Sequence, residues 1–285
     1  MPPALVALVV APLSKRVLMT DLSIAPAAGR VTVEQRGHLL LMGIDRPLKR
    51  NAFGPELLTS LVAAFDTLED TAAARVGVVF AEGAHFTAGL DLMAMVPVFA
   101  AGALPLPPES VHPWDLGGRP RTKPVVVAVQ GLCLTLGIEL LLATDVAVAA
   151  DDARFAQIEV KRGIFPFGGA TLRFHQRCGW GNAMRWILTG DEFNAAEALR
   201  IGLVQEVVPA GTQKERAIAI SDRIAQQAPL AVRATLASSK QARDEGPLEA
   251  ARHLDSTLRR LIATEDASEG LSSFLERRDA EFRGK

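Results

Sequence analysis

An unbroken apolar run, Val125–Val129, constrains the fold more than any other stretch of this chain. Its residues are β-branched or small, so the run suits a strand that is buried on both faces, as in the parallel sheets of α/β proteins. The strand breaks at Gln130-Gly131, and the chain then bends through Gly137 into an apolar helix that carries Glu139 near its start. The core is therefore predicted to contain a strand, a tight turn and a helix in direct succession.

A second acidic residue follows in an equally apolar setting. Glu159 ends the segment Phe155–Glu159 and precedes a turn that contains Gly163, Pro166, Gly168 and Gly169. A carboxylate buried without a partner is costly, so two such acids need a purpose. Shared acid-base chemistry is one purpose that fits both Glu139 and Glu159.

Each glutamate also has a purely structural interpretation. Glu139 could be an acid that stabilises the helix dipole at the start of its helix. Glu159 could be an ion-pair partner of Lys161 or Arg162, which follow it closely in the sequence. The apolar residues on both sides of Glu139 argue against the first alternative.

The remaining pattern alternates between strands and helices and then becomes helical. We expect a hairpin over residues 31–44, a helix from Pro55, strands at 76–80 and 146–149, a helix from about Gly169, a helix capped by Asn194 and Glu197 and ended by Gly202, and a strand at 203–208. From Gln213 onward the pattern is helical. This order predicts one α/β core followed by a helical region.

Length and composition set the domain limits and exclude several partners. We expect an N-terminal extension at residues 1–28, a core at 29–210 and a helical region at 211–285. The apolar stretch Ala4–Leu13 is too short to span a bilayer, and its basic residues follow it, unlike those of a secretion signal. With 31 basic and 32 acidic side chains, no global charge favours nucleic acid or a membrane surface. Two cysteines form no disulfide framework, so we expect a reducing compartment, the cytoplasm. The five histidines lack metal-ligand spacing, and no metal is expected.

The stretch Ala84–Leu92 is the second informative feature. It follows the strand at 76–80 and leads through small residues into an amphipathic segment, in which Asp91 suits the role of helix cap. A strand that turns into a helix leaves backbone N–H groups pointing into open space. If the turn after Val129 does the same, the N–H groups near Leu90 and Leu136 can converge on one oxygen as an oxyanion hole.

Several motifs together resemble the crotonase superfamily of enoyl-CoA hydratases and isomerases over nearly all of residues 30–285. The motifs are Asp45-Arg46-Pro47 with Asn51-Ala52, Phe86–Leu92, Gln130-Gly131 with Gly137-Ile138-Glu139, Phe155–Glu159, the turn Gly163, Pro166 and Gly169, Leu188-Thr189-Gly190, Ala195–Ala198, Gly202-Leu203-Val204, and Phe274 with Glu276-Arg277-Arg278. Each motif is weak alone, but their order and spacing are specific. The resemblance implies a ClpP/crotonase-like α/β fold, a spiral of ββα units, with a C-terminal helical region that forms trimers.

The resemblance also implies a reaction and its catalytic groups. The backbone N–H groups of Leu90 and Leu136 would hold the thioester oxygen, and Glu139 and Glu159 would be the two acid-base residues of a hydratase. Water would add across a 2-enoyl-CoA, and the two acids would share one proton and titrate as a unit. Coenzyme A would be part of the substrate, and no separate cofactor is expected.

Substrate binding and assembly are likewise implied by the resemblance. The expected contacts to CoA come from Arg46, Lys49, Arg50, Ala88, Leu90, Asp91, Leu92, Phe274 and Arg277. The last two often act from a neighbouring subunit, so a homotrimer, commonly paired into a hexamer, is expected. Two departures stand out: Thr135-Leu136 replaces small glycines before Glu139, and Met93 replaces a lysine that often contacts the CoA phosphate. The acyl pocket should therefore differ from that of the common hydratases.

Three alternatives stay open from the sequence. The chain could be a Δ3,Δ2-enoyl-CoA isomerase or a specialised acyl-CoA dehydratase in which Glu159 is the main base. It could also be a catalytically idle CoA-binding or scaffold subunit. His85 is interpreted as a turn residue, and Leu92, Met93, Met95 and Val96 as one apolar helix face that also borders the acyl tunnel. The segment 96–124, with Trp114, is expected to shape the pocket.

Overall fold

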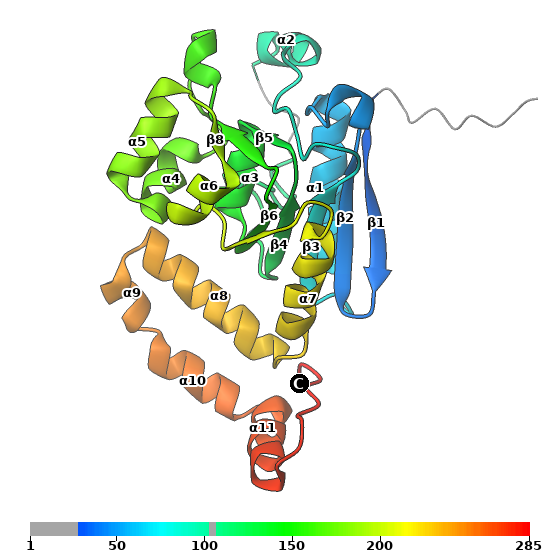
Figure 1. The fold of residues 1–285 in the computed structure, drawn as a ribbon. Helices are drawn as coiled ribbons and strands as arrows, with labels where there is room; N and C mark the ends of the chain where they lie inside the picture. The colour runs from blue at the N-terminus through cyan, green and yellow to red at the C-terminus, as the bar shows by residue number, and fades with distance from the viewer. Residues whose placement is uncertain (1–27, 103–106) are drawn as a thin grey trace, which may run out of the picture.

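The computed structural model describes residues 28–102 and 107–285 (Figure 1). Almost all of the predicted N-terminal extension therefore lies outside the described residues.

A six-stranded sheet forms the centre of the protein, in the order β1-β2-β3-β4-β6-β9. Its strands are β1 (Arg30–Arg36), β2 (Leu39–Asp45), β3 (Val76–Ala81), β4 (Val125–Val129), β6 (Val146–Ala150) and β9 (Glu206–Val208). β1 pairs antiparallel with β2, as the predicted hairpin requires, and every other pair is parallel. All five residues of β4 are buried, which confirms the fully buried strand.

The two faces of this sheet are covered by different helices because side chains alternate along each strand. One face, which includes Leu41, Val78 and Val126, packs under α7 (Gln213–Ala225). The other face, which includes Met42 and Val127, belongs to the larger core with α1 (Pro55–Asp70). Pro55 occupies the first turn of α1, as predicted.

A smaller sheet and four helices pack beyond the second face. The sheet contains β5 (Leu132–Leu134), β7 (Arg154–Ala156) and β8 (Phe193–Asn194), and the helices are α3 (Leu136–Ala143), α4 (Ala170–Cys178), α5 (Trp180–Thr189) and α6 (Ala195–Arg200). The structure also contains the short 3-10 helices η1 (Pro47–Lys49) and η2 (Glu159–Arg162). Cys133 and Cys178 are both free and buried.

Three local predictions need correction. The strand expected at 203–208 is only Glu206–Val208. At α6, Asn194 Oδ1 accepts from the N–H of Glu197 as predicted, but the Glu197 carboxylate pairs with Arg200 at 2.6 Å. In α2 (Leu92–Ala100), Met95 is buried whereas Leu92, Met93 and Val96 are exposed, so these four residues do not share one buried apolar face.

The C-terminal region is helical, as predicted, and most of it extends away from the core (Figure 1). After α7 the chain forms α8 (Pro229–Asp244), α9 (Pro247–Ala251), α10 (Leu254–Ile262) and α11 (Glu265–Glu276). The tail then returns to the core, where Arg75 donates to the carbonyl of Phe282 at 2.8 Å. Within residues 28–102 and 107–285, no helix combines the length and apolarity that a membrane span requires.

Candidate active site

Two turns at the ends of neighbouring strands lie side by side. The turn after β3 runs along β5, because Thr87 N–H donates to the carbonyl of Leu132 at 2.8 Å and Leu134 N–H donates to the carbonyl of Thr87 at 3.0 Å. Three residues beyond each of Thr87 and Cys133, which are paired in this bridge, come Leu90 and Leu136. The pairing therefore brings the two predicted oxyanion residues to the same place.

Both backbone N–H groups are available to a ligand. Among the described residues, neither Leu90 N–H nor Leu136 N–H donates a hydrogen bond. Leu136 is the first residue of α3, where backbone N–H groups have no partner within the helix. Both residues line a pocket of about 70 Å³, together with Glu159 and Thr135.

Glu139 is buried completely and is held by one oxygen only. Its Oε1 accepts from Ala170 N–H at 3.1 Å, at the start of α4. Its Oε2 is buried and has no partner among the described residues. A Cβ on Gly168 would clash with this oxygen, so the carboxyl group packs directly against the backbone of the glycine turn. The helix-dipole alternative does not explain a buried, half-satisfied carboxyl group.

Glu159 enters the site from the end of β7. Thr135 N–H donates to the carbonyl of Ala156 at 3.0 Å, which ties this strand to the start of α3. The Oε1 of Glu159 accepts from Gln157 at 3.0 Å, and its Oε2 is buried without a partner among the described residues. Glu159 forms no ion pair with Lys161, which pairs instead with Asp191 at 3.3 Å. The structure therefore contradicts the alternative in which Glu159 forms an ion pair with Lys161.

The two carboxyl groups sit in surroundings that favour their protonated forms. Burial raises the pKa of Glu139 to about 7, against the opposing hydrogen bond from Ala170, and the charge of Glu159 raises this pKa further. Burial likewise raises the pKa of Glu159 to about 7, against the hydrogen bond from Gln157. Near neutral pH, each group can therefore hold or release a proton at low cost, as acid-base catalysts must.

Trp114 supports both segments that carry the unpaired N–H groups, one at Leu136 directly and the other at Leu90 through Phe53. Its indole N–H donates to the carbonyl of Leu136 at 2.9 Å. Its ring meets Phe53 edge to face at 5.6 Å, and the backbone of Phe53 bonds to Gly89 and Asp91 on either side of Leu90. No described residue of the segment 96–124 lines the pocket, so the expectation that this segment shapes the pocket stays a prediction.

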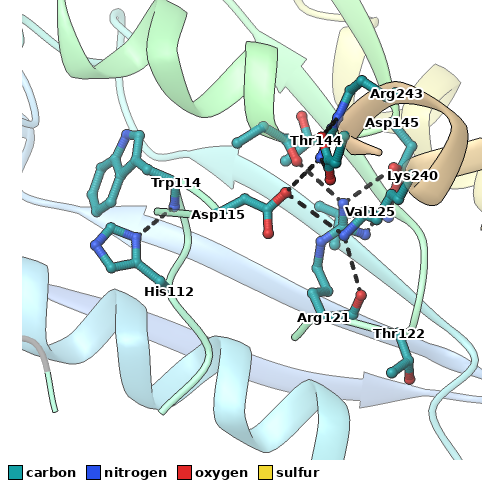
Figure 2. Close-up of polar contacts among 12 residues, drawn as sticks. His112, Trp114, Asp115, Arg121, Thr122, Val125, Thr144, Asp145, Lys240 and Arg243 are labelled. Atoms are coloured by element: carbon teal, nitrogen blue, oxygen red, sulfur yellow. Dashed lines mark hydrogen bonds and ion pairs between the residues drawn. The ribbon is translucent and has the colours of Figure 1, made fainter. Parts of the chain in front are cut away.

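The residue after Trp114 connects this support to the C-terminal region. Figure 2 shows the Asp115 side chain directed toward α8, where its carboxylate contacts Arg243 at 3.2 Å and Lys240 at 3.9 Å. From α4, the buried Arg173 donates to the carbonyl of Trp114 at 2.9 Å and also to that of Asp115. The position of Trp114 thus depends on contacts to two separate helices.

The residues predicted to bind CoA divide into two groups. Arg46 is buried, and its guanidinium donates to the carbonyl of Ala52 and pairs with Asp91 at 3.0 Å. Asp91 also caps α2 through a bond from Ala94 N–H. The helix cap expected of Asp91 is therefore confirmed, and the contacts of Arg46 and Asp91 to CoA stay predictions.

The residues of the second group are exposed at the surface or line the pocket. Lys49 and Arg50 are exposed, and Ala88 and Leu92 line the pocket with Leu90. Phe274 is 78% exposed on α11, and Arg277 ends that helix. Neither Phe274 nor Arg277 lines the pocket of its own chain.

Sequence reasoning missed several residues of the site. Ala170 N–H and Trp114 act through contacts that join segments distant in the chain, and no local pattern points to them. Arg162, which lines the pocket, was considered only as an ion-pair partner of Glu159. His85 is a turn residue, as predicted: its Nδ1 accepts from Leu132 N–H at 3.2 Å, and it does not line the pocket.

The chain is similar in sequence to proteins of known family. A sequence profile of the Enoyl-CoA hydratase/isomerase family matches residues 34–285. Enoyl-CoA hydratase EchA19 of Mycobacterium tuberculosis is 33% identical over 264 residues, which cover 89% of this chain and 96% of that protein. The 2,3-dehydroadipyl-CoA hydratase of Escherichia coli is 33% identical over 256 residues, with 89% and 98% covered.

Solved structures of proteins named as enoyl-CoA hydratases or hydratase/isomerases have folds similar to that of this chain. A probable enoyl-CoA hydratase/isomerase from Mycobacterium abscessus superposes with a TM-score of 0.87 and 48% identity, covering 90% of this chain and 98% of that one. An enoyl-CoA hydratase from Mycobacterium tuberculosis superposes with a TM-score of 0.82 and 36% identity, with 90% and 99% covered.

Proposed function

Since this chain belongs to the enoyl-CoA hydratase/isomerase family, we propose that it adds water across the double bond of a 2-enoyl-CoA thioester to form a 3-hydroxyacyl-CoA. The crotonase-like α/β fold expected from the sequence is confirmed by the same comparisons. The relatives named as hydratases support hydration at the level of the family.

One observation supports this function most strongly. Several polar groups at the site lack partners among the described residues, among them the N–H groups of Leu90 and Leu136 and the Oε2 atoms of Glu139 and Glu159. Buried polar groups in folded proteins are almost always hydrogen-bonded, so a cluster of unpartnered groups indicates a ligand. Two donors suit a thioester oxygen, and two carboxyl oxygens suit a water molecule.

The proposed mechanism uses these groups together. The Leu90 and Leu136 N–H groups bind the thioester oxygen and stabilise the negative charge that develops on it. One of the two glutamates accepts a proton from the water as its oxygen bonds to C3, and the other supplies the proton that bonds to C2. The C2–C3 π bond is lost, and the pair ends with the same total number of protons. The raised pKa values of both groups, each about 7, favour this sharing of a proton.

Assembly and CoA binding belong to the same proposal. Lys49 and Arg50 offer exposed positive charge to the CoA phosphates near the pocket. Phe274 and Arg277 of one subunit would contact the CoA bound to its neighbour in a homotrimer or a pair of trimers. Exposed leucines on the outlying C-terminal helices support such an assembly.

Two isosteric substitutions test the proposal. Glu139→Gln and Glu159→Gln should each lower the kcat for crotonyl-CoA hydration by at least about 100-fold, because each removes one member of a proton-sharing pair. The loss of ultraviolet absorbance of the enoyl thioester measures the rate. Glu215→Gln, an exposed residue on α7, is the matched control and should keep full activity.

The same experiment separates the alternatives. An isomerase or a dehydratase that depends on Glu159 should lose far more activity from Glu159→Gln than from Glu139→Gln. A scaffold subunit should bind CoA but turn over no enoyl-CoA of any chain length. Either result would contradict the hydratase proposal.

A further inference from the structure

Thr135 has a backbone conformation that its side chain disfavours. Its φ is +50° and its ψ is −112°, a region that glycine adopts readily and that β-branched residues almost never adopt. Two bonds hold this conformation: Thr135 N–H donates to Ala156, and the carbonyl of Thr135 accepts from Glu139 N–H at 3.1 Å. A strained non-glycine residue at a site is a reason to look for a role of its side chain.

The side chain of Thr135 carries an unused hydroxyl group. Thr135 is 9% exposed, and its Oγ1 is buried and lacks a hydrogen-bond partner among the described residues. A buried hydroxyl without a partner is unfavourable, so the structure retains a group that valine would fill more cheaply.

The location of this hydroxyl is defined by its two neighbours. A Cβ on Gly89 would clash with Thr135 Oγ1, so the hydroxyl lies directly against the residue that precedes Leu90. Thr135 itself precedes Leu136. The hydroxyl therefore belongs to the residue before one unpaired N–H group and lies against the residue before the other, and Thr135 lines the same pocket as Leu90, Leu136 and Glu159.

We propose that the Thr135 hydroxyl is a catalytic group that donates a third hydrogen bond to the thioester oxygen of the substrate. This inference rests on the proposed function, since it assumes that a thioester binds at Leu90 and Leu136. A carbonyl oxygen has two lone pairs, and an enolate oxygen carries more negative charge and accepts further donors. The third bond therefore gains strength as charge develops, which is the condition for catalysis.

Three substitutions at this position test the proposal. Thr135→Val keeps the shape and removes the hydroxyl, and it should lower kcat by about 100-fold, the usual loss for one oxyanion donor. Its KM should change little, because the bond strengthens mainly in the transition state. Thr135→Ser keeps the hydroxyl and should retain most of the activity. Thr144→Val, a buried threonine just after α3, is the matched control and should keep kcat.

The third substitution separates catalysis from folding. Thr135→Gly relieves the positive φ, so its melting temperature should rise, while its kcat should fall as far as that of Thr135→Val. A threonine that only maintained the fold would give the opposite pattern, with lower stability and lower activity in parallel. That pattern would overturn the proposal.

A spectroscopic measurement completes the test. The carbonyl stretch of an enoyl-CoA labelled with ¹³C at the thioester should move to lower frequency on binding to the wild type, and less so on binding to Thr135→Val. Equal shifts and equal kcat in the two proteins would overturn the role of Thr135 and leave the hydratase proposal intact. A wild type that neither hydrates nor shifts the stretch would overturn both.

Discussion

At the scale of single residues, the burial of Glu139 suits its proposed acid-base role but lowers the stability of the fold when the carboxyl group is ionised. Its carboxyl group is fully buried, and its pKa is raised from 4.5 to about 7 by that burial. An unfolded chain would release this proton near pH 4.5, whereas the folded protein keeps it up to about pH 7. The protonated carboxyl group of Glu139 therefore makes its full contribution to stability below pH 4.5, and this contribution is lost as the pH rises to about 7.

A comparison of unfolding free energies across pH tests this residue directly. Because one pKa unit corresponds to about 1.4 kcal/mol, Glu139→Gln should gain about 3 kcal/mol relative to the wild type between pH 4.5 and pH 7. Above pH 7 the difference should stay constant. Urea unfolding at a series of pH values measures it, with Glu215→Gln following the wild type throughout. A difference that is independent of pH would contradict the raised pKa.

At the scale of elements, the site depends on how two turns and one loop are held together. Hydrogen bonds between Thr87 and β5 align the turns, and Trp114 supports both from behind. Trp114 in turn depends on Arg173 of α4 and, through Asp115, on α8. The proposed oxyanion donors, the N–H groups of Leu90 and Leu136, are therefore positioned by contacts among elements that are far apart in the sequence.

Removal of the indole N–H of Trp114 tests whether this side chain helps to position Leu136. Trp114→Phe keeps an aromatic ring but loses the bond to the carbonyl of Leu136, and it should lower the free energy of unfolding by about 1 to 2 kcal/mol. Its kcat should also fall, because Leu136 would be held less firmly. Trp186→Phe makes the same change at a buried tryptophan packed against Phe193, outside the pocket, and should keep kcat. Equal kcat for the two variants would argue against a role for Trp114.

At the scale of the whole molecule, the C-terminal helices leave an apolar stripe uncovered. Leu254, Leu258 and Ile262 recur every four residues on α10 and are each more than half exposed. A continuous exposed apolar stripe on an outlying helix is typical of a surface that another chain covers. We expect this stripe to be part of the contact between subunits of the proposed trimer.

Sedimentation velocity tests this assembly. Leu258→Asp places a charge in the stripe and should convert the assembly to monomers, since an unpaired charge is costly in an apolar contact. Its activity should fall too, because Phe274 and Arg277 could no longer reach the CoA of a neighbour. Ser256→Asp adds the same charge on the other side of α10 and should stay assembled. If Leu258→Asp sediments like the wild type, the stripe is not the contact.

The fold and most of the proposed site follow from local patterns in the sequence. The apolar run of β4, the Pro55 helix start and the Asp91 cap depend on neighbouring residues, and each was predicted correctly. A strand, a turn and a helix in succession were expected to leave the N–H groups of Leu90 and Leu136 unpaired, and neither donates a hydrogen bond among the described residues. The catalytic roles of these groups and of Glu139 and Glu159 stay predictions.

Only the tertiary structure decided which polar groups are left without partners. Whether Arg46 faces a ligand or Asp91, whether Trp114 reaches Leu136, and whether the Thr135 hydroxyl finds an acceptor all depend on contacts between distant segments. Hydrogen bonding is directional and acts over a few ångströms, so composition and periodicity carry little information about it. Apolar burial is not directional, and its periodicity is written along the chain, which is why the sequence alone predicted the core.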